Sequence, residues 1–382
     1  MPHQNIVFRD ILKQVPWDEF DRLVEDHKSD ARVRTLSTKD QFIALVYGQL
    51  SGASSLRDIV ARLQSHEARL YHVGAKPVRR STLADANSAR PSALFSELFG
   101  AMVSCAHRGL RRKIGEATYL IDSTSLPLNN LSSDWAKFSD GVCGAKAHVI
   151  YDPDADRPVY VCVSAANVND ITPAKAMPIV EGATYVFDLG YYDFGWWAKL
   201  DDAKCRIVTR FKKHTKLEVI ERRPVPEGRN ILSDRIGYLP ERMARSRKNP
   251  LRCEVREVRV KIATGKVLRI LTNDIKASAQ EIADLYKRRW AIELFFRWVK
   301  QTLKITRFLG TSENAIRIQI AIALITFLLL RMAQAAQKIV KSPLEFARLV
   351  RANLMHRRRI DRLIGSEPKP PPDPRQFAIQ WA

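Results

Sequence analysis

The chain of 382 residues is long enough to bury a sizeable core, and its length favours two or three domains. Hydrophobic residues make up 46% and charged residues 27%, a balance that excludes a largely disordered chain. Lys and Arg total 63 against 41 Asp and Glu, which leaves a net charge of +22 at pH 7. So much positive charge predicts a polyanionic partner. Nucleic acid is favoured over an anionic membrane, because basic residues are spread along the whole chain.

Cysteine spacing and the apolar runs bear on the compartment. The five cysteines stand far apart without a Cys-x-x-Cys pair, which disfavours zinc and disulfide frameworks and fits a reducing cytoplasm. The N-terminus lacks the layout of a signal peptide. The apolar run Ile320–Leu330 is interrupted by Thr326 and is shorter than the roughly 20 residues that a bilayer requires. We therefore expect a cytoplasmic, nucleoid-associated protein without a membrane span, in which this run forms a buried helix.

Residues 1–112 are predicted to form a helical region that binds DNA. Apolar residues recur at helical spacing in Asp40–Leu50 and again in Leu56–Leu63, with a Gly- and Ser-rich break between them. Arg79 and Arg80 then lead a further short helix. This order is typical of helix-turn-helix DNA readers, although any small helical bundle shares it. The basic charge of the chain favours DNA contact, with Arg79 and Arg80 among the contacting residues.

Residues 113–340 change to the alternation of strands and helices that is typical of a mixed α/β domain. Five apolar or β-rich runs are predicted strands: Thr118–Ile121, Lys146–Tyr151, Val159–Ser164, Thr184–Phe187 and Cys205–Arg210. Short helices are expected at Thr172–Ile179 and Gly190–Ala203.

A strongly basic segment of alternating stretches, about 211–265, is predicted to be a β-rich insertion into this domain. The chain returns to the core sheet at Val267–Thr272 and continues in a long helix from Ala279. Residues 341–382 are read as a basic helical C-terminal region with a proline-rich tail.

Two acids stand at the ends of predicted strands. Asp122 follows the apolar run Thr118–Ile121, and Asp188 follows Thr184–Phe187. A strand end presents a side chain on a rigid support at the edge of a sheet, where an ion can be coordinated. A single such acid more often caps a turn, but two from neighbouring strands begin to indicate a metal site.

A third acid lies in the long helix. Ser278 and Glu281 form a capping box that predicts the start of this helix. Tyr286, Arg289, Glu293 and Lys300 follow at offsets that place them on one narrow stripe. Beside it runs an apolar stripe that would dock the helix on the sheet: Leu285, Ile292, Phe296, Val299 and Leu303. A solvated face with salt-bridged pairs is the alternative interpretation of the polar stripe.

Asp122, Asp188 and Glu293 together would suit phosphodiester chemistry with two divalent ions. One ion lowers the pKa of an attacking water or 3′-hydroxyl, and the other stabilises the leaving oxygen. Mg²⁺ prefers carboxylate oxygens, which explains the absence of His and Cys from the set; Mn²⁺ is the expected substitute. Arg289 and Lys300 would grip phosphates beside Glu293.

The helix motif Tyr286-x2-Arg289-x3-Glu293-x6-Lys300 resembles the Y-R-E-K signature of DDE insertion-sequence transposases (insertion sequence family four). The runs Ile121-Asp-Ser-Thr124 and Asp188-Leu-Gly-Tyr-Tyr-Asp-Phe194 are similar to the motifs around the first and second aspartates of that family. The resemblance extends over about residues 30–340 of the chain.

The resemblance implies an RNase H-like catalytic core with a β-rich insertion between the second and third acids. It also implies Mg²⁺-dependent cutting and joining at the terminal inverted repeats of a transposon, by a homodimer that holds two ends of double-stranded DNA and a target. Tyr286, Arg289 and Lys300 would hold the terminal phosphates. A nuclease of the same fold without strand transfer, or a catalytically silent DNA-binding derivative, is the alternative. Inverted repeats beside the gene would separate the transposase from the nuclease.

Other polar and aromatic residues are given structural roles. Asp170 precedes a predicted helix and is expected to cap it. Asp193 lies within the start of the helix predicted at Gly190–Ala203 and is expected to cap it or to face solvent. Lys146 and His148 alternate along one strand, where polar residues of an edge strand are favoured over a DNA-phosphate contact. Core packing is favoured over base stacking for Trp196–Trp197.

Overall fold

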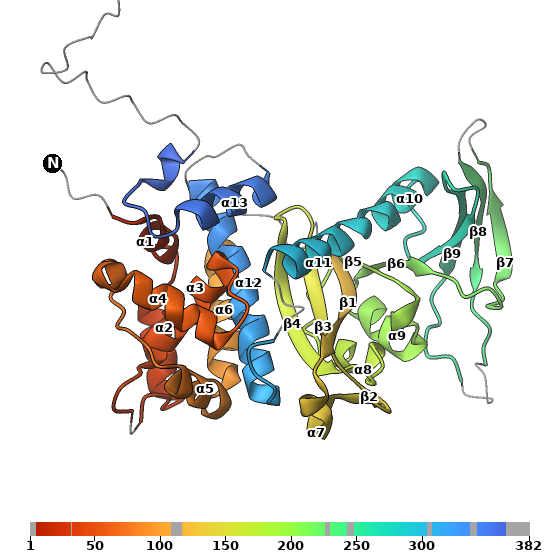
Figure 1. The fold of residues 1–382 in the computed structure, drawn as a ribbon. Helices are drawn as coiled ribbons and strands as arrows, with labels where there is room; N and C mark the ends of the chain where they lie inside the picture. The colour runs from red at the N-terminus through yellow and green to blue at the C-terminus, as the bar shows by residue number, and fades with distance from the viewer. Residues whose placement is uncertain are drawn as a thin grey trace, which may run out of the picture.

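The computed structural model describes residues 5–31, 33–107, 117–225, 230–242, 248–303, 308–336 and 342–363. A helical body, drawn mostly in red, orange and blue, lies beside a body built on one large sheet (Figure 1). The predicted proline-rich tail lies outside the described residues.

The helical body joins the N-terminal helices to two helices from the end of the chain. Its helices are α1 (Val7–Leu12), α2 (Trp17–Asp26), α3 (Thr38–Ser51), α4 (Leu56–Ser65), α5 (Arg80–Ala89), α6 (Ser92–His107), α12 (Glu313–Ala336) and α13 (Pro343–Asn353). Helix α3 begins where the Ser37 side chain accepts a hydrogen bond from the Asp40 amide, and ends at Gly52, whose φ of 69° favours glycine. The helices predicted around this break are therefore confirmed.

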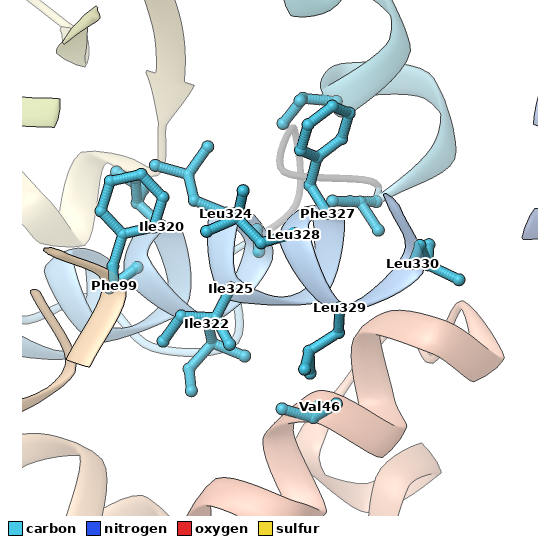
Figure 2. Close-up of a cluster of buried hydrophobic side chains, with 14 of the residues drawn as sticks. Val46, Phe99, Ile320, Ile322, Leu324, Ile325, Phe327, Leu328, Leu329 and Leu330 are labelled. Atoms are coloured by element: carbon cyan, nitrogen blue, oxygen red, sulfur yellow. The ribbon is translucent and has the colours of Figure 1, made fainter. Parts of the chain in front are cut away.

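Helix α12 is the buried helix predicted from the run Ile320–Leu330. It is long and apolar enough to cross a membrane by length and composition, but 83% of its most apolar window is buried inside the protein. Its side chains pack against α3 and α6, and Val46 and Phe99 lie in the same apolar cluster (Figure 2). Although α12 falls within residues 113–340, it packs into the N-terminal helices and so ties the two bodies together.

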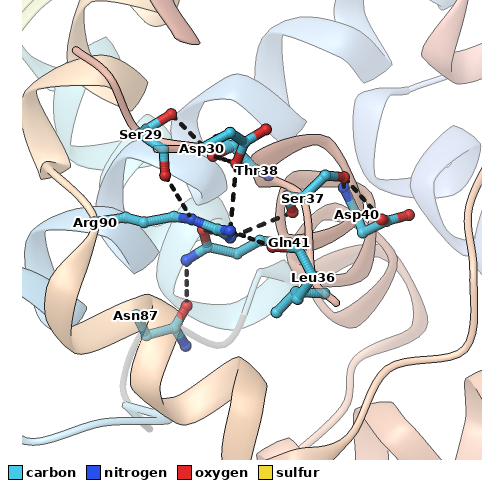
Figure 3. Close-up of polar contacts among 9 residues, drawn as sticks. All are labelled: Ser29, Asp30, Leu36, Ser37, Thr38, Asp40, Gln41, Asn87 and Arg90. Carbon is cyan, nitrogen blue, oxygen red and sulfur yellow. Dashed lines mark hydrogen bonds and ion pairs between the residues drawn. The ribbon is translucent and has the colours of Figure 1, made fainter. Parts of the chain in front are cut away.

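A buried arginine fastens α5 to the loop before α3 (Figure 3). The guanidinium of Arg90 donates hydrogen bonds to the carbonyl oxygens of Ser29, Leu36 and Ser37. It also donates to Gln41 Oε1 at 2.9 Å and forms an ion pair with Asp30 at 3.3 Å. Because the Arg90 side chain is only 8% exposed, these acceptors would lose a partner that water could not readily replace.

Replacement of Arg90 with Leu is therefore expected to lower the free energy of unfolding by about 3 kcal/mol, as for other buried charged groups that lose their partner. Urea unfolding followed by far-UV circular dichroism would measure this change. Arg22→Leu is the control, because Arg22 is exposed and pairs only with Glu19 and Asp26 on its own helix. Equal stability of the two variants would contradict the role given to Arg90.

The sheet has the strand order and directions of an RNase H-like core. Its core strands are β1 (Thr118–Leu128), β3 (Val142–Asp152), β4 (Arg157–Ala165), β5 (Thr184–Phe187) and β6 (Arg206–Arg210). Strands β1, β3 and β4 form an antiparallel meander, and β5 and β6 continue parallel to β1 on its other side. The order is thus β4-β3-β1-β5-β6, which confirms the predicted mixed α/β fold with an RNase H-like core.

The basic segment 211–265 adds β7 (Glu218–Arg223), β8 (Ile231–Tyr238) and β9 (Val255–Lys261), so its predicted β-rich character is confirmed where it is described. Strand β10 (Val267–Thr272) pairs antiparallel with β6 and with β9. The insertion therefore extends the core sheet through β10 and forms its far edge (Figure 1).

Helices cover both faces of the core sheet. Helices α10 (Ala279–Arg288) and α11 (Trp290–Thr302) pack on one face, and α9 (Phe194–Asp202) packs on the other (Figure 1). Trp196 and Trp197 are buried in α9 and confirm the core-packing interpretation. The side chain of Asp193 accepts a hydrogen bond from the Trp196 amide, which confirms its capping role.

The single long helix predicted from Ala279 is instead two helices that meet at Arg289. The helix begins as expected, because the side chain of Ser278 accepts a hydrogen bond from the Glu281 amide. At Arg289 the backbone tightens, since its amide bonds to the Tyr286 carbonyl and its carbonyl accepts from the Ile292 amide, each across three residues. The apolar stripe remains buried through this joint.

Two further helices are shorter than predicted. In place of Thr172–Ile179 the structure has α8 (Ile171–Ala174). A helix that ran on to Ile179 would require helical geometry at Met177, which Pro178 disfavours. The helix expected from Gly190 begins at Phe194 and follows a 3-10 turn, Leu189–Tyr191.

Candidate active site

Two of the predicted acids meet at adjacent strands in the middle of the sheet. Ile121 of β1 lies opposite Phe187 of β5 in the parallel register, so Asp122 and Asp188 come next on each strand. Asp188 directly follows the end of β5, as predicted. The prediction that Asp122 also ends its strand is wrong, because β1 continues to Leu128 and pairs Asp122 with Val149 of β3. Only the pairing of β1 with β5 ends before Asp122, at Ile121 and Phe187.

Glu293 approaches the same place from α11. Side chains alternate across β1, so Leu120 and Asp122 share the face that α11 covers, whereas Ile121 packs with the cluster around α9. Arg289 bridges the two elements: its Nη1 lies 3.1 Å from Asp122 Oδ2, and its Nη2 lies 2.6 Å from Glu293 Oε1. The polar stripe therefore faces the strands and is not simply a solvated surface.

The carboxyl of Asp122 is held in an environment that opposes its ionisation. Burial and the negative charge of Asp188 raise the pKa of Asp122 to about 7, although the amide of Ser123 and the guanidinium of Arg289 favour the ionised form. Glu293 adds to the rise in this pKa. Both other acids thus oppose the ionisation of Asp122, and a cation beside this carboxyl would relieve the repulsion.

The donor set matches a hard divalent ion in its chemistry. All three side chains offer carboxylate oxygens, which Mg²⁺ and Mn²⁺ favour. In the part of the chain that the structure describes, no three His, Cys, Asp or Glu side chains are already gathered around a common ligation point. Arg289 lies between Asp122 and Glu293, so a bound cation would compete with its guanidinium for these oxygens.

The other members of the predicted stripe lie near the acids to different degrees. Tyr286 is 8% exposed, and the Arg289 guanidinium lies 6.0 Å from its ring centroid. Its pKa is raised by burial, and neighbouring charges that include Asp188 also act on it. Lys300 stands two turns beyond Glu293, about 10 Å along the helix axis, and partial burial lowers its pKa.

Three residues that were given ordinary structural roles lie beside the acids. Asp170 makes no capping hydrogen bond to α8, so that prediction is wrong. Lys146 and His148 do not belong to an edge strand, because β3 lies between β1 and β4. Instead, Lys146 Nζ lies 3.0 Å from Asp170 Oδ1, and His148 is fully buried with its Nδ1 at 3.9 Å from the same oxygen. Ser123, which was not singled out, donates its hydroxyl to Asp170.

The residues predicted to contact DNA in the N-terminal region lie in the helical body, not in the body built on the sheet. Arg79 occupies the residue before α5, and Arg80 is its first residue. Both side chains are exposed, so they are available to a phosphate backbone. Because α5 is fastened by Arg90 and by hydrogen bonds from Asn314 of α12, these two arginines stand on a fixed support.

Sequence comparisons identify relatives over most of the chain. A family model described as a transposase DDE domain matches residues 114–329. A second model, described as a domain of unknown function (DUF4372), matches residues 3–76. The first match alone spans more than half of the chain and includes all three acids.

Individual relatives agree with the family match. A protein of Sinorhizobium fredii named as transposase y4zB is 40% identical over 315 residues, which cover 81% of this chain and 85% of the relative. A Geobacillus stearothermophilus protein named as the transposase of insertion sequence element IS5377 is 29% identical and covers 68% and 69% of the two chains. Among solved structures, a piggyBac transposase synaptic complex with hairpin DNA has a TM-score of 0.45 at 12% identity and covers 91% of this chain and 78% of that chain. The sequence matches carry the family assignment.

Proposed function

Because this chain belongs to the DDE transposases of insertion sequences, we propose that it cuts DNA at the terminal inverted repeats of a mobile element and joins the freed ends to target DNA. The observation that supports this proposal is that Asp122 and Asp188 follow the last paired residues of two adjacent strands, and that Arg289 contacts both Asp122 and Glu293. Carboxylates on a rigid sheet and a basic side chain among them suit a reaction on a phosphodiester.

Asp122, Asp188 and Glu293 would hold two divalent ions, Mg²⁺ or Mn²⁺, through carboxylate oxygens. Bound there, the ions would supply activation of a water or 3′-hydroxyl and stabilisation of the leaving oxygen. Both terminal nitrogens of Arg289 donate to carboxylates, one of Asp122 and one of Glu293. When divalent ions bind these carboxylates, the guanidinium would be free to bind a DNA phosphate instead. Tyr286 and Lys300 would contact the terminal phosphates on either side of it along the helix.

The helical N-terminal region, 1–112, would bind the terminal repeats through α5, and residues 113–340 would carry the chemistry. Joining two ends to one target requires two active sites, so we expect a homodimer on DNA. Its substrates would be the double-stranded repeats and target DNA of the nucleoid, in the cytoplasm. The net charge of +22 is consistent with a duplex as the principal partner.

Cleavage of DNA that carries the sequences flanking the gene tests the proposal. With Mg²⁺ or Mn²⁺ we expect cuts at the repeat boundary, and with a chelator we expect binding without cuts. Cleavage of unrelated DNA at the same rate would favour the alternative of a nuclease without strand transfer. Binding without cleavage under every metal condition would favour a catalytically silent derivative.

Removal of the two exposed arginines at α5 is expected to weaken DNA binding without affecting the fold. The slope of log K against log salt is negative, and every phosphate that the protein no longer neutralises reduces its magnitude by about 0.9. Arg79→Ala with Arg80→Ala should therefore reduce the magnitude by about 2. A band-shift titration at several salt concentrations measures this slope. Lys13→Ala with Arg22→Ala removes the same charge from residues already paired with acids and serves as the control. An equal reduction of the magnitude of this slope in the control would exclude α5 as the specific contact.

A further inference from the structure

We propose that Asp170, with Lys146 as its counter-ion, is a positioning residue that holds Asp122 and Asp188 in place for metal binding. This inference rests on the proposed function, because it assigns a support to the same site. Asp170 belongs neither to the three acids nor to the Tyr-Arg-Glu-Lys stripe. Its role follows from contacts that join three separate segments of the chain.

The Asp170 carboxylate is fixed by two donors from neighbouring strands. Its Oδ1 accepts from Ser123 Oγ of β1 at 3.0 Å and from Lys146 Nζ of β3 at 3.0 Å. Lys146 also donates to the carbonyl of Val168 at 3.0 Å, which ties it to the segment that precedes Asp170. The side chains of Lys146 and Asp170 are 19% and 22% exposed, so this pair is shielded more than a typical surface ion pair.

Ser123 connects Asp170 to Asp122, because it forms hydrogen bonds with both carboxylates. Ser123 anchors its hydroxyl on Asp170, and its amide donates to Asp122 Oδ1 at 2.8 Å. Because side chains alternate across β1, Ser123 projects to the opposite face from Asp122. Asp170 thus holds β1 in place from the face that carries Ser123. The Ser123 amide in turn limits the rotation of the Asp122 carboxylate on the opposite face.

A second connection runs through Gly190. A Cβ added at this glycine would lie 3.0 Å from Asp170 Oδ2 and 3.0 Å from Asp188 Oδ1, so the two carboxylates flank its Cα. The Gly190 amide also donates to Asp188 Oδ1 at 2.8 Å. The turn that orients Asp188 is therefore packed directly against Asp170, and a larger residue at position 190 would push on both carboxylates.

These contacts distinguish a support from a metal ligand. Asp170 Oδ1 is already shared by a hydroxyl and an ammonium, and the ammonium supplies the positive charge that a cation would otherwise provide. His148 of the same strand as Lys146 is fully buried, and its Nδ1 lies 3.9 Å from the same oxygen of Asp170. Residues that orient metal-holding side chains commonly change metal affinity by about 10- to 100-fold when they are replaced.

The test measures Mn²⁺ binding by the free protein, through the rise in its unfolding temperature as Mn²⁺ is added. We expect Asp170→Ala and Ser123→Ala each to require at least about tenfold more Mn²⁺ than wild type for half of the rise, with Asp170→Asn in between because its amide oxygen can still accept. The Mg²⁺ concentration for half-maximal DNA cleavage should shift in parallel. If Asp170→Ala fails to fold, Ser123→Ala decides the question, because it removes only a hydroxyl.

Asp193→Ala is the matched control, since Asp193 also precedes a helix and pairs with a lysine, Lys175, at 2.7 Å. It should lose stability but keep the wild-type Mn²⁺ requirement. If Asp170→Ala and Ser123→Ala keep the same Mn²⁺ requirement as Asp193→Ala, the inference is overturned. In that case, cleavage of DNA by the wild-type protein would still support the proposed function. Wild-type protein that neither responds to Mn²⁺ nor cleaves DNA would overturn both.

Discussion

Asp122→Asn, Asp188→Asn and Glu293→Gln are each expected to abolish metal-dependent cleavage of terminal DNA while DNA binding persists. Each change keeps the size of the side chain but replaces a charged ligand oxygen with an amide. Loss of about 4 kcal/mol of transition-state stabilisation corresponds to a rate about 10³-fold lower. Binding should persist or strengthen slightly, because each variant removes one negative charge near the bound phosphates.

Single-turnover cleavage and band-shift assays on the same DNA would measure the two properties separately. Asp140→Asn is the matched control: its side chain is 99% exposed and pairs only with Lys137 at the surface, so wild-type cleavage is expected. Normal cleavage by any one of the three site variants would remove that acid from the assignment.

Asp122→Asn is also expected to stabilise the protein above pH 7 when divalent ions are absent. The pKa of Asp122 is raised to about 7, whereas an aspartate in an unfolded chain has a pKa of about 3.9. Between these values the folded protein keeps a proton that the unfolded chain releases, so the free energy of unfolding falls as the pH rises. The full cost, about 4 kcal/mol, is reached above pH 7 and vanishes below about pH 4.

The asparagine variant removes this cost and keeps one acceptor oxygen, which can serve either the Ser123 amide or Arg289, because these two donors bond to different oxygens of Asp122. Urea unfolding should be measured from pH 4.5 to pH 8.5. The free energy of unfolding of the variant should exceed that of wild type by an amount that grows up to about pH 7 and then stays constant. Addition of Mg²⁺ should narrow the gap by stabilising wild type alone. An advantage that does not change with pH would contradict the assigned environment of Asp122.

The parts of the site that the sequence predicted are those with a local periodic signal. Glu293 could be placed because helical spacing puts it on one stripe with Arg289, and that pair lies 2.6 Å apart in the structure. Asp188 follows an apolar run that is a complete strand. Asp122 lies on the predicted strand, but the prediction ended this strand too early, because the residues that follow Asp122 are polar.

The parts that could not be predicted depend on contacts between distant segments. Asp170 lies 47 residues from Ser123, and a helix cap was the simplest local interpretation of its position. Likewise, α12 follows α10 and α11 in sequence but packs among the N-terminal helices, which no local pattern reveals. The joint at Arg289 was missed because the helical stripe continues through it almost unchanged.

The central claim, that these acids serve cutting and joining, is tested most directly with a pre-cleaved terminal repeat that bears a free 3′-hydroxyl and a supercoiled plasmid as target. With Mg²⁺ the wild-type protein should produce plasmid covalently joined to the repeat, and Glu293→Gln should produce none. Equal joining by Glu293→Gln would show that the acids lie outside the chemistry. A wild-type protein that cuts terminal DNA but never joins it would identify a nuclease and contradict the account.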